Sequence, residues 1–248
     1  MHTSSELFQQ LKALGINPKG TLKVHLSYKA IGDVEGGPQT VIQTLADYMK
    51  DGLLVLPAHT WDNVKAPNPV MDTLYTPTCV GIVTELFRKF PDVKRSCHPT
   101  HSVCALGQGA EAFLAGEHQL TTPCGKGGAY YKLWERDAQI LLIGVNFMRN
   151  TFIHGIEEWD GAKGTLASEP ADYYVITPSG QRLHTPQYRH NSPRGSRTFT
   201  KLEPLALQQN ILTLGKFGSA TTRLMSAKQL RALVAPLLAE DPWYLYHY

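Results

Sequence analysis

Residues 139–145, Gln-Ile-Leu-Leu-Ile-Gly-Val, form the strongest apolar run in the chain. A short run of this kind is typical of a strand buried on both faces, as in a parallel sheet covered by helices. Two similar segments precede it, at 21–26 (TLKVHL) and 53–58 (LLVLPA), and helical patterns at 38–50 and 81–90 lie between the three. Strands that alternate with helices predict a layered α/β domain.

The same patterns continue outward in both directions. Residues 172–184 (DYYVITPSGQRLH) predict a β-hairpin that turns at Pro178-Ser179-Gly180, so we expect a mixed sheet. A polar, basic segment follows at 185–200. Helices are also predicted at 4–14, with Ser4 or Ser5 as the N-cap, at 109–116 and at 226–238. Another helix is predicted to begin near Thr151, and a strand is predicted at 102–107.

Composition excludes several classes of protein. The 248 residues are enough for one large domain, predicted here over 1–248. The net charge of +3 comes from scattered lysines and arginines, which argues against nucleic-acid binding. No apolar run approaches the ~20 residues of a membrane helix, and no secretory signal is visible. The four cysteines form no C-x-x-C pair, so we expect reduced thiols and a cytoplasmic protein.

Residues 24–38 run from a strand through a glycine-rich turn into a helix. Gly36 and Gly37 let backbone N–H groups approach a ligand, and the helix N-terminus adds partial positive charge. Ser27 and Lys29 offer further donors for phosphate. The glycine spacing matches neither a P-loop nor G-x-G-x-x-G, so an ordinary strand–turn–helix link remains the alternative.

Two other segments carry histidines. His98 and His101 precede the strand at 102–107. His154 and Glu157 share a helix face after the strand at 139–145, and open α/β sheets bind ligands at such strand ends. A histidine oriented by a carboxylate is suited to act as a general base. A pair of charges on a helix surface is the alternative.

The histidines of these two segments also permit a function other than general-base catalysis. His98, His101, His154 and Glu157 can be drawn as a zinc set, which predicts a metal-dependent hydrolase. A third hypothesis is a non-catalytic binder of a coenzyme or of sugar amines. Separately, the pair Trp61-Asp62 lies in a long predicted loop at 58–77, and a carboxylate beside an aromatic ring suits a cationic or polyhydroxy ligand unless it only anchors the loop.

Three segments together resemble the aminoglycoside 3-N-acetyltransferase (antibiotic N-acetyltransferase) family. VHLSYKAIGDVEGG (24–37) resembles its V-H-x-S-L-x-x-I-G-x-V-x-G-G segment, with Tyr28 in place of leucine. KRSCHPTHSVCALG (94–107) resembles its R-S-x-H-P-x-x-S-x-x-A-x-G segment, and ILLIGVNFMRNTFIHGIEE (140–158) resembles its L-L-x-G…T-x-x-H-x-x-E segment. The order and spacing also match, over about residues 5–165.

The resemblance implies a three-layer α/β/α sandwich with a mixed sheet, and an enzyme that transfers acetyl from acetyl-coenzyme A to an amino group of an aminoglycoside or related amine, without a metal. It implies His154 as the base and Glu157 as its partner, with direct transfer favoured over a route through Cys97 or Cys124. Thr151 or backbone N–H groups near 27–29 are candidates for the oxyanion donors. The implied coenzyme residues are Ser27, Tyr28, Lys29, Val34, Gly36, Gly37, Ser102 and Val103, and the implied acceptor residues are Trp61, Asp62, His98 and Glu158.

The sequence also departs from the family. Gly125-Lys126-Gly127-Gly128-Ala129 stands where the family has G-x-G-S-P, and the loop after Trp61 is short. A polycationic acceptor needs several carboxylates. The chain offers a modest acidic wall from Asp62, Asp72, Glu157, Glu158 and Asp160, while the basic segment Arg189–Arg197 could cover the coenzyme phosphates or face a less cationic acceptor. The sequence leaves the acceptor open, and it also leaves open whether the chain is a monomer or a homodimer.

Overall fold

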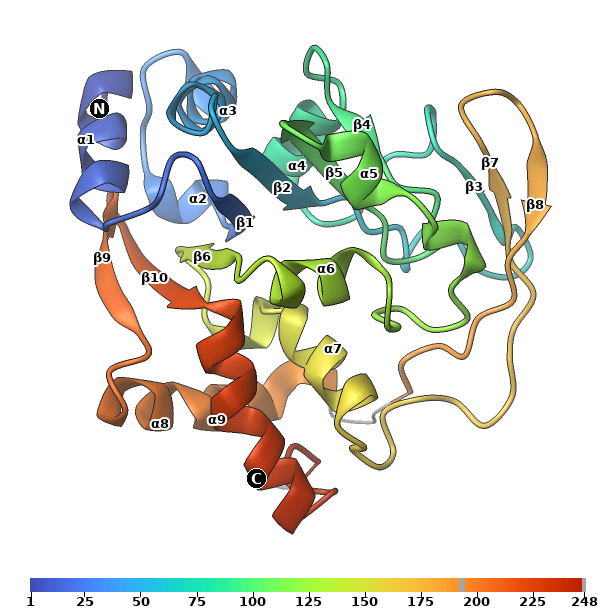
Figure 1. The fold of residues 1–248 in the computed structure, drawn as a ribbon. Coiled ribbons are helices and arrows are strands. Elements are labelled where there is room, and N and C mark those ends of the chain that lie inside the picture. The colour runs from blue at the N-terminus through green and yellow to red at the C-terminus, as the bar shows by residue number, and fades with distance from the viewer. Residues whose placement is uncertain (192–194, 247–248) are drawn as a thin grey trace.

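A seven-stranded mixed sheet forms the centre of the computed structural model, which describes residues 1–191 and 195–246 (Figure 1). Its strand order is β4-β5-β2-β1-β6-β10-β9. Strand β1 pairs in parallel with β2 and β6, and the outer strands run antiparallel to their neighbours. The strands are β1 (Thr21–Leu26), β2 (Leu53–Pro57), β4 (Lys94–Arg95), β5 (Val103–Gly107), β6 (Gln139–Ile143), β9 (Thr213–Phe217) and β10 (Ala220–Ser226).

The three parallel strands are buried on both faces, as their apolar runs predict. Successive side chains of a strand point to opposite faces. In β6, Leu141 and Ile143 belong to one hydrophobic core, whereas Ile140 and Leu142 belong to the other. Two cores of this kind need helices on each side of the sheet, which is the predicted three-layer arrangement.

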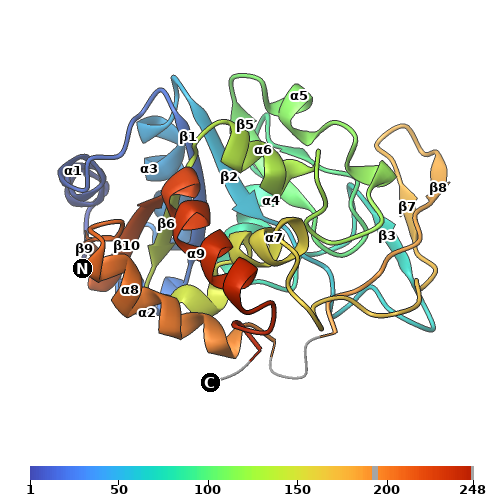
Figure 2. The same cartoon turned by 60° about the horizontal axis from the view of Figure 1, so that its bottom comes forward.

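Helices cover both faces of the main sheet (Figures 1 and 2). One core contains residues of α1, α3 and α4, and the other contains residues of α5 to α9. The predicted α/β/α class with a mixed sheet is therefore confirmed, while a single domain over 1–248 stays a prediction. The helices are α1 (Ser4–Ala13), α2 (Tyr28–Ile31), α3 (Gly37–Tyr48), α4 (Ile82–Arg88), α5 (Ala110–Leu114), α6 (Ala129–Glu135), α7 (Phe152–Trp159), α8 (Leu202–Gln208) and α9 (Ala227–Glu240), with 3₁₀ turns at Glu117–Gln119, Phe147–Arg149 and Gly195–Lys201.

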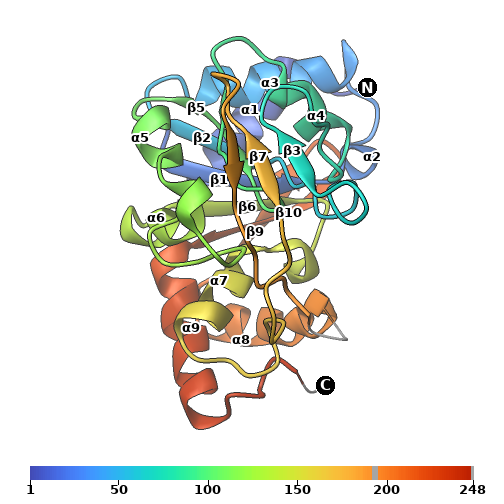
Figure 3. The same ribbon diagram turned by 90° about the vertical axis from the view of Figure 1, so that its right-hand side faces the viewer.

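The predicted hairpin forms, but it does not join the main sheet. Strands β7 (Tyr174–Ile176) and β8 (Arg182–His184) pair antiparallel, and β3 (Val70–Asp72), inside the predicted loop 58–77, pairs in parallel with β7. This three-stranded sheet lies to one side of the molecule, in front of the main sheet in Figure 3. The mixed character of the main sheet comes instead from β4, β5, β9 and β10.

Several elements differ from the sequence-based expectations. The first helix is capped by Thr3, whose hydroxyl accepts a hydrogen bond from the Glu6 N–H, and not by Ser4 or Ser5. Helix α6 and the hairpin of β9 and β10 were not expected, because their residues mix polar and apolar types without a clear period. Among the described residues, no helix is long and apolar enough to cross a membrane.

The central strand β1 buries a lysine. Lys23 is fully buried, its side-chain nitrogen has no hydrogen-bond partner among the described residues, and Nζ lies 5.5 Å from the ring centroid of Tyr130. Burial holds the pKa of Lys23 well below its ordinary value. The side chain therefore weakens the core around it.

We expect Lys23→Met to raise the free energy of unfolding by about 1–3 kcal/mol, because an apolar chain of similar length replaces an unsatisfied polar group. Chemical denaturation at pH 7.5 measures the change. Lys216→Met, at an exposed position of β9, is the control and should change stability by less than about 0.5 kcal/mol. A loss of stability in Lys23→Met would show that the ammonium group has a stabilising role.

Candidate active site

A cavity of about 1210 Å³ opens at the carboxyl ends of the parallel strands β1, β2 and β6. Ser27 and Tyr28 line it just after β1, His59 lies two residues after β2, and Gly144 follows β6 directly. This is the edge at which an open α/β sheet binds ligands. Gly144 has φ +64°, and a Cβ there would lie 2.3 Å from the Ala30 Cβ, so only glycine lets α2 begin this close to β6.

Strand register brings two histidines together. Because β5 is antiparallel to β2, it begins at the edge where β2 ends, and Ala58 and Thr60 donate backbone hydrogen bonds to the carbonyls of Ser102 and Thr100. His59 and His101 therefore lie side by side, with ring centroids 4.8 Å apart. His59 Nε2 also lies 2.7 Å from the Tyr130 hydroxyl.

Helix α7 supplies the predicted base. His154 Nδ1 lies 2.6 Å from Glu157 Oε2, one turn further along the helix, and the carboxylate accepts the Nδ1–H. Both side chains are largely buried, at 14% and 7% exposure, so this is no solvated surface pair. Since Glu157 occupies Nδ1 and His154 lines the cavity, Nε2 is the nitrogen left for a substrate proton.

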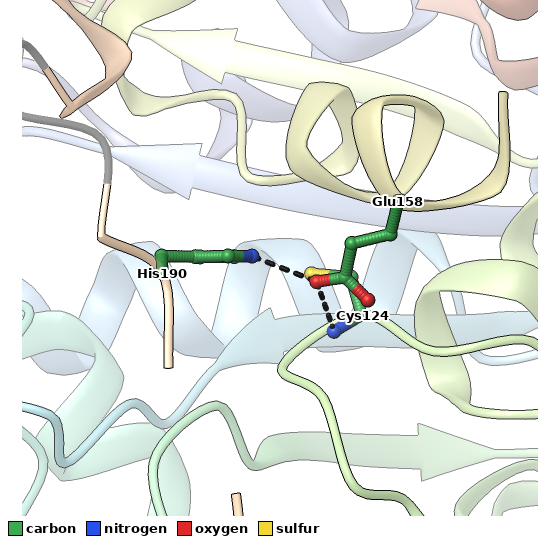
Figure 4. A group of neighbouring side chains, drawn as sticks. All are labelled: Cys124, Glu158 and His190. Carbon is green, nitrogen blue, oxygen red and sulfur yellow. Dashed lines mark hydrogen bonds and ion pairs between the residues drawn. The ribbon is translucent and has the colours of Figure 1, made fainter. Parts of the chain in front are cut away.

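A second histidine–carboxylate pair lies against the first. His190 Nε2 donates to Glu158 Oε1 over 2.7 Å, and the same oxygen accepts the backbone N–H of Cys124 (Figure 4). The His190 ring packs on the His154 ring with centroids 4.3 Å apart and planes 31° apart. Carboxylates from one helix therefore orient both rings. The sequence offered no signal for His190, which lies in an irregular segment far from α7 along the chain.

Burial keeps most of these histidines neutral. Burial lowers the pKa of His59, His101 and His190 well below the ordinary value, and neighbouring histidines lower each pKa further. These three rings, of His59, His101 and His190, are thus uncharged at neutral pH.

His98 orders the loop before β5 and does not line the cavity. It is fully buried, its Nδ1 accepts the N–H groups of Thr100 and His101, and its Nε2–H donates to the Thr122 carbonyl. Burial lowers its pKa to about 4. This burial leaves His98 no exposed surface for the predicted contact with substrate.

The predicted coenzyme residues divide into two groups. Ser27, Tyr28 and Lys29 line the cavity. Ser102 and Val103 are fully buried, and the Ser102 hydroxyl accepts from Arg95 Nε and donates to the Ala58 carbonyl. The structure therefore corrects the expectation that these two residues offer a groove surface, because strand pairing covers them.

The glycine pair at the start of α3 has a conformational role. Gly36 and Gly37 have φ of +74° and +71°, and a Cβ on Gly36 would lie 2.4 Å from the Thr40 hydroxyl. Val34 is buried in the core beneath them. None of the three lines the cavity, so their proposed contact with coenzyme stays a prediction.

On the acceptor side, the structure does not assemble the expected acidic wall. Trp61 lines the cavity, but Asp62 is 65% exposed and pairs with Lys65. Glu158 is buried against His190. The other three acids also have partners: Glu157 accepts from His154, Asp72 caps the turn at Leu74 and Tyr75, and Asp160 pairs with Arg231.

The cysteines are unpaired and poorly placed for nucleophilic catalysis. Cys124 is 1% exposed, and burial raises its pKa well above the ordinary value. Cys97 contacts the Thr73 hydroxyl, and neither cysteine lines the cavity. Cys79 does line it, but burial raises its pKa as well. The positions of these cysteines and the raised pKa values of Cys79 and Cys124 favour direct transfer of the acetyl group to the amine over a route through a cysteine.

The predicted zinc set is not assembled as a ligand group. In the described part of the chain, the one group with metal-ligand spacing is Cys124, Glu158 and His190, in which Glu158 already accepts two hydrogen bonds. It shares no residue with the set of His98, His101, His154 and Glu157. Of the predicted basic segment, Arg189 and Arg197 line the cavity, and Arg194 lies outside the described residues.

Comparison with known proteins identifies the family. The profile described as aminoglycoside 3-N-acetyltransferase matches residues 24–239. The chain belongs to this family. An aminoglycoside N(3')-acetyltransferase-like protein, YokD, of Bacillus subtilis (strain 168) is 30% identical over 245 residues, covering 90% of this chain and 88% of the relative. The resemblance drawn from the three motifs is confirmed, and the hydrolase alternative finds no support.

Solved structures agree with this membership. The aminoglycoside acetyltransferase AAC(3)-IVa, in complex with a gentamicin, has a TM-score of 0.83 at 26% identity and covers 99% of this chain and 92% of its own. AAC-IIIb, in a binary complex with coenzyme A, has a TM-score of 0.84 at 24% identity and covers 96% of this chain and 97% of its own. The second likeness supports the fold.

The buried histidines predict acid sensitivity. Five of them, His25, His59, His98, His101 and His190, have a pKa lowered by burial, to about 4 for His98. Each contributes stability that is fully present above the unfolded value of 6.5 and is lost as the pH falls towards the folded pKa. Two buried carboxyls, Glu117 with a pKa of about 6 and Glu158 with a pKa of about 7, act in the opposite direction.

Because the histidines outnumber these carboxyls, we expect the thermal unfolding midpoint to fall steeply between pH 7 and pH 5.5. Each net proton bound on unfolding lowers the free energy of unfolding by about 1.4 kcal/mol per pH unit. Above about pH 7.5 these histidines are uncharged in both the folded and the unfolded state, so their contribution to the slope ends there. The control is the Lys23→Met variant, which removes the separate contribution of the buried lysine and should keep the fall below pH 7. A midpoint that stays level down to pH 5.5 would contradict the neutral state of this cluster.

Proposed function

We propose that this protein transfers the acetyl group of acetyl-coenzyme A directly to an amine, with His154 as general base. Acetyl-coenzyme A is the cosubstrate of the family. The observation that carries the proposal is His154 at the cavity wall, with Nδ1 held by buried Glu157, beside the turn of Ser27, Tyr28 and Lys29. The base and the expected coenzyme turn thus share one cavity.

The reaction needs proton transfer at Nε2. A protonated amine has no lone pair, so His154 takes the proton, and the amine nitrogen then attacks the thioester carbonyl carbon. The new C–N bond forms, the C–S bond breaks, and the leaving thiolate takes a proton from the imidazolium. Neutral His154 then accepts the second proton of the attacking nitrogen and passes it to solvent, which leaves the neutral amide. Glu157 stabilises that imidazolium and holds its orientation.

Positioning supplies much of the remaining rate enhancement. Holding amine and thioester together replaces a bimolecular step with an effectively unimolecular one. Thr151 lines the cavity three residues before His154 and is a candidate donor to the thioester oxyanion. The backbone N–H groups of Tyr28 and Lys29, in the first turn of α2, are the other candidates.

The coenzyme is expected along the wall that follows β1 and β6. Lys29 and Arg149 are exposed there and can pair with its phosphates. We further propose that the protein works in the cytoplasm, because four unpaired cysteines suit a reducing compartment. A homodimer stays a prediction that sedimentation of the purified protein would test.

Removing the base tests this function. His154→Ala should lower kcat by roughly 10²–10⁴, with little change in coenzyme affinity, because the imidazole acts on the amine proton. Glu157→Gln should lower kcat less, since the ring remains but loses its charged partner. Thiol release from acetyl-coenzyme A in the presence of amines measures turnover, and calorimetry measures coenzyme binding.

His184→Ala is the matched control, because His184 also pairs with a carboxylate, Asp172, but is exposed on β8 outside the cavity. This variant should keep full activity. If His154→Ala retained near-full turnover, the proposed role of His154 would be wrong. If it lost turnover and coenzyme binding together, the loss would point to altered cavity structure instead.

A further inference from the structure

Among the described residues, the cavity wall carries cations and no acids. Lys29, Arg149, Arg189 and Arg197 line it, all four are exposed, and none has an ion-pair partner among the residues that the structure describes. In the same described part of the chain, no aspartate or glutamate is among the lining residues. Burial lowers the pKa of His25, His59, His101 and His190 on the wall well below the ordinary value, so these four rings add no charge to the wall at neutral pH.

The nearest carboxylates cannot change this sign. Glu157 and Glu158 are 7% and 3% exposed, and each is bonded to a histidine ring that lies between it and the cavity. Asp62, the acid expected on the acceptor side, pairs with Lys65 outside. Because no exposed carboxylate lies among the described lining residues, a ligand with several ammonium groups would lose its hydration there without gaining a protein partner.

The four cations do not share one wall. Lys29 follows β1, and Arg149 lies six residues after β6, so both belong to the coenzyme wall. Arg197 lies in the 3₁₀ turn Gly195–Lys201, whose Ser196 hydroxyl donates to the Met148 carbonyl, so it lies on the Arg149 side. Arg189 comes from the segment after β8, directly before His190, whose ring packs on His154. Tyr173, which directly precedes β7 of the small sheet, also lines the cavity. Within the described chain, Arg189 is thus a cation without an ion pair. It lies next to His190, on the side of the cavity where His154 would meet the amine.

We propose that the acceptor is an amine that also carries an anionic group, a phosphate or a carboxylate, and that Arg189 binds this group. The inference rests on the proposed acetyl transfer and names the class of amine. A guanidinium pairs with either anion through two parallel hydrogen bonds, which would orient the amine towards His154. The binding of the anion and of the coenzyme then uses different cations.

Matched pairs of amines test the proposal on the protein saturated with coenzyme A, so that the coenzyme's own phosphate sites are filled. Calorimetry compares glucosamine 6-phosphate with glucosamine for the phosphate, and muramic acid with glucosamine for the carboxylate. We expect at least one anionic amine to bind about 10-fold or more tightly than glucosamine, the usual effect of a charge-assisted pair. Kanamycin, a polycation, should bind more weakly than that amine.

Two variants locate the effect. Arg189→Gln should abolish the preference for the anionic amine and leave coenzyme affinity within about twofold. Lys29→Gln should weaken coenzyme binding and keep the preference, once coenzyme saturates the variant. If Arg189→Gln weakens coenzyme binding and leaves the preference intact, Arg189 belongs to the coenzyme site and the proposal is wrong.

Turnover separates this proposal from the proposed function. Tighter binding of kanamycin than of both anionic amines, or equal binding of all of them, would overturn the anionic class while acetyl transfer could continue. Absence of thiol release with every amine, together with a preference abolished in Arg189→Gln, would overturn the transferase activity but support the anion site. The two failures therefore give different results.

Discussion

The pairing of β5 antiparallel to β2, next to the parallel pairs of β1, is the constraint on which the site depends. It places the carboxyl ends of three strands and the beginning of a fourth at one edge of the sheet. His59, His101 and the Ser27–Lys29 turn meet there because backbone hydrogen bonds set their register. The two buried cores on either face keep that register, since a slip of one residue would turn every apolar side chain to the wrong face.

Helix α7 adds the proposed base to this edge. Its neighbouring carboxylates, Glu157 and Glu158, orient two histidines that pack on one another. One ring belongs to the same helix and the other to a segment more than thirty residues away. Burial of both carboxylates behind the rings lets them act on the imidazoles and removes their charge from the cavity wall. The geometry that builds the base thus also leaves a cationic cavity.

The sequence predicted the parts whose signal is local. Apolar runs identified β1, β2 and β6, and the spacing of His154 and Glu157 predicted a pair on one helix face, which the structure forms. Residues whose environment depends on distant segments were harder. Ser102 and Val103 fit the family motif but are covered by strand pairing, and Asp62 pairs with its near neighbour Lys65 instead of facing the cavity. His190 gave no signal, because its partner Glu158 lies on another element.

By itself, then, the sequence determined the apolar strands β1, β2 and β6, the family, and the pairing of His154 with Glu157, because periodicity and short spacing act within a few residues. Only the tertiary structure decided which of the nearby acids and cations reach the cavity. That outcome depends on burial and on pairs between segments far apart in the chain, such as His190 with Glu158 and Asp160 with Arg231. The charge of the acceptor wall is the sum of those pairings, which no single segment contains.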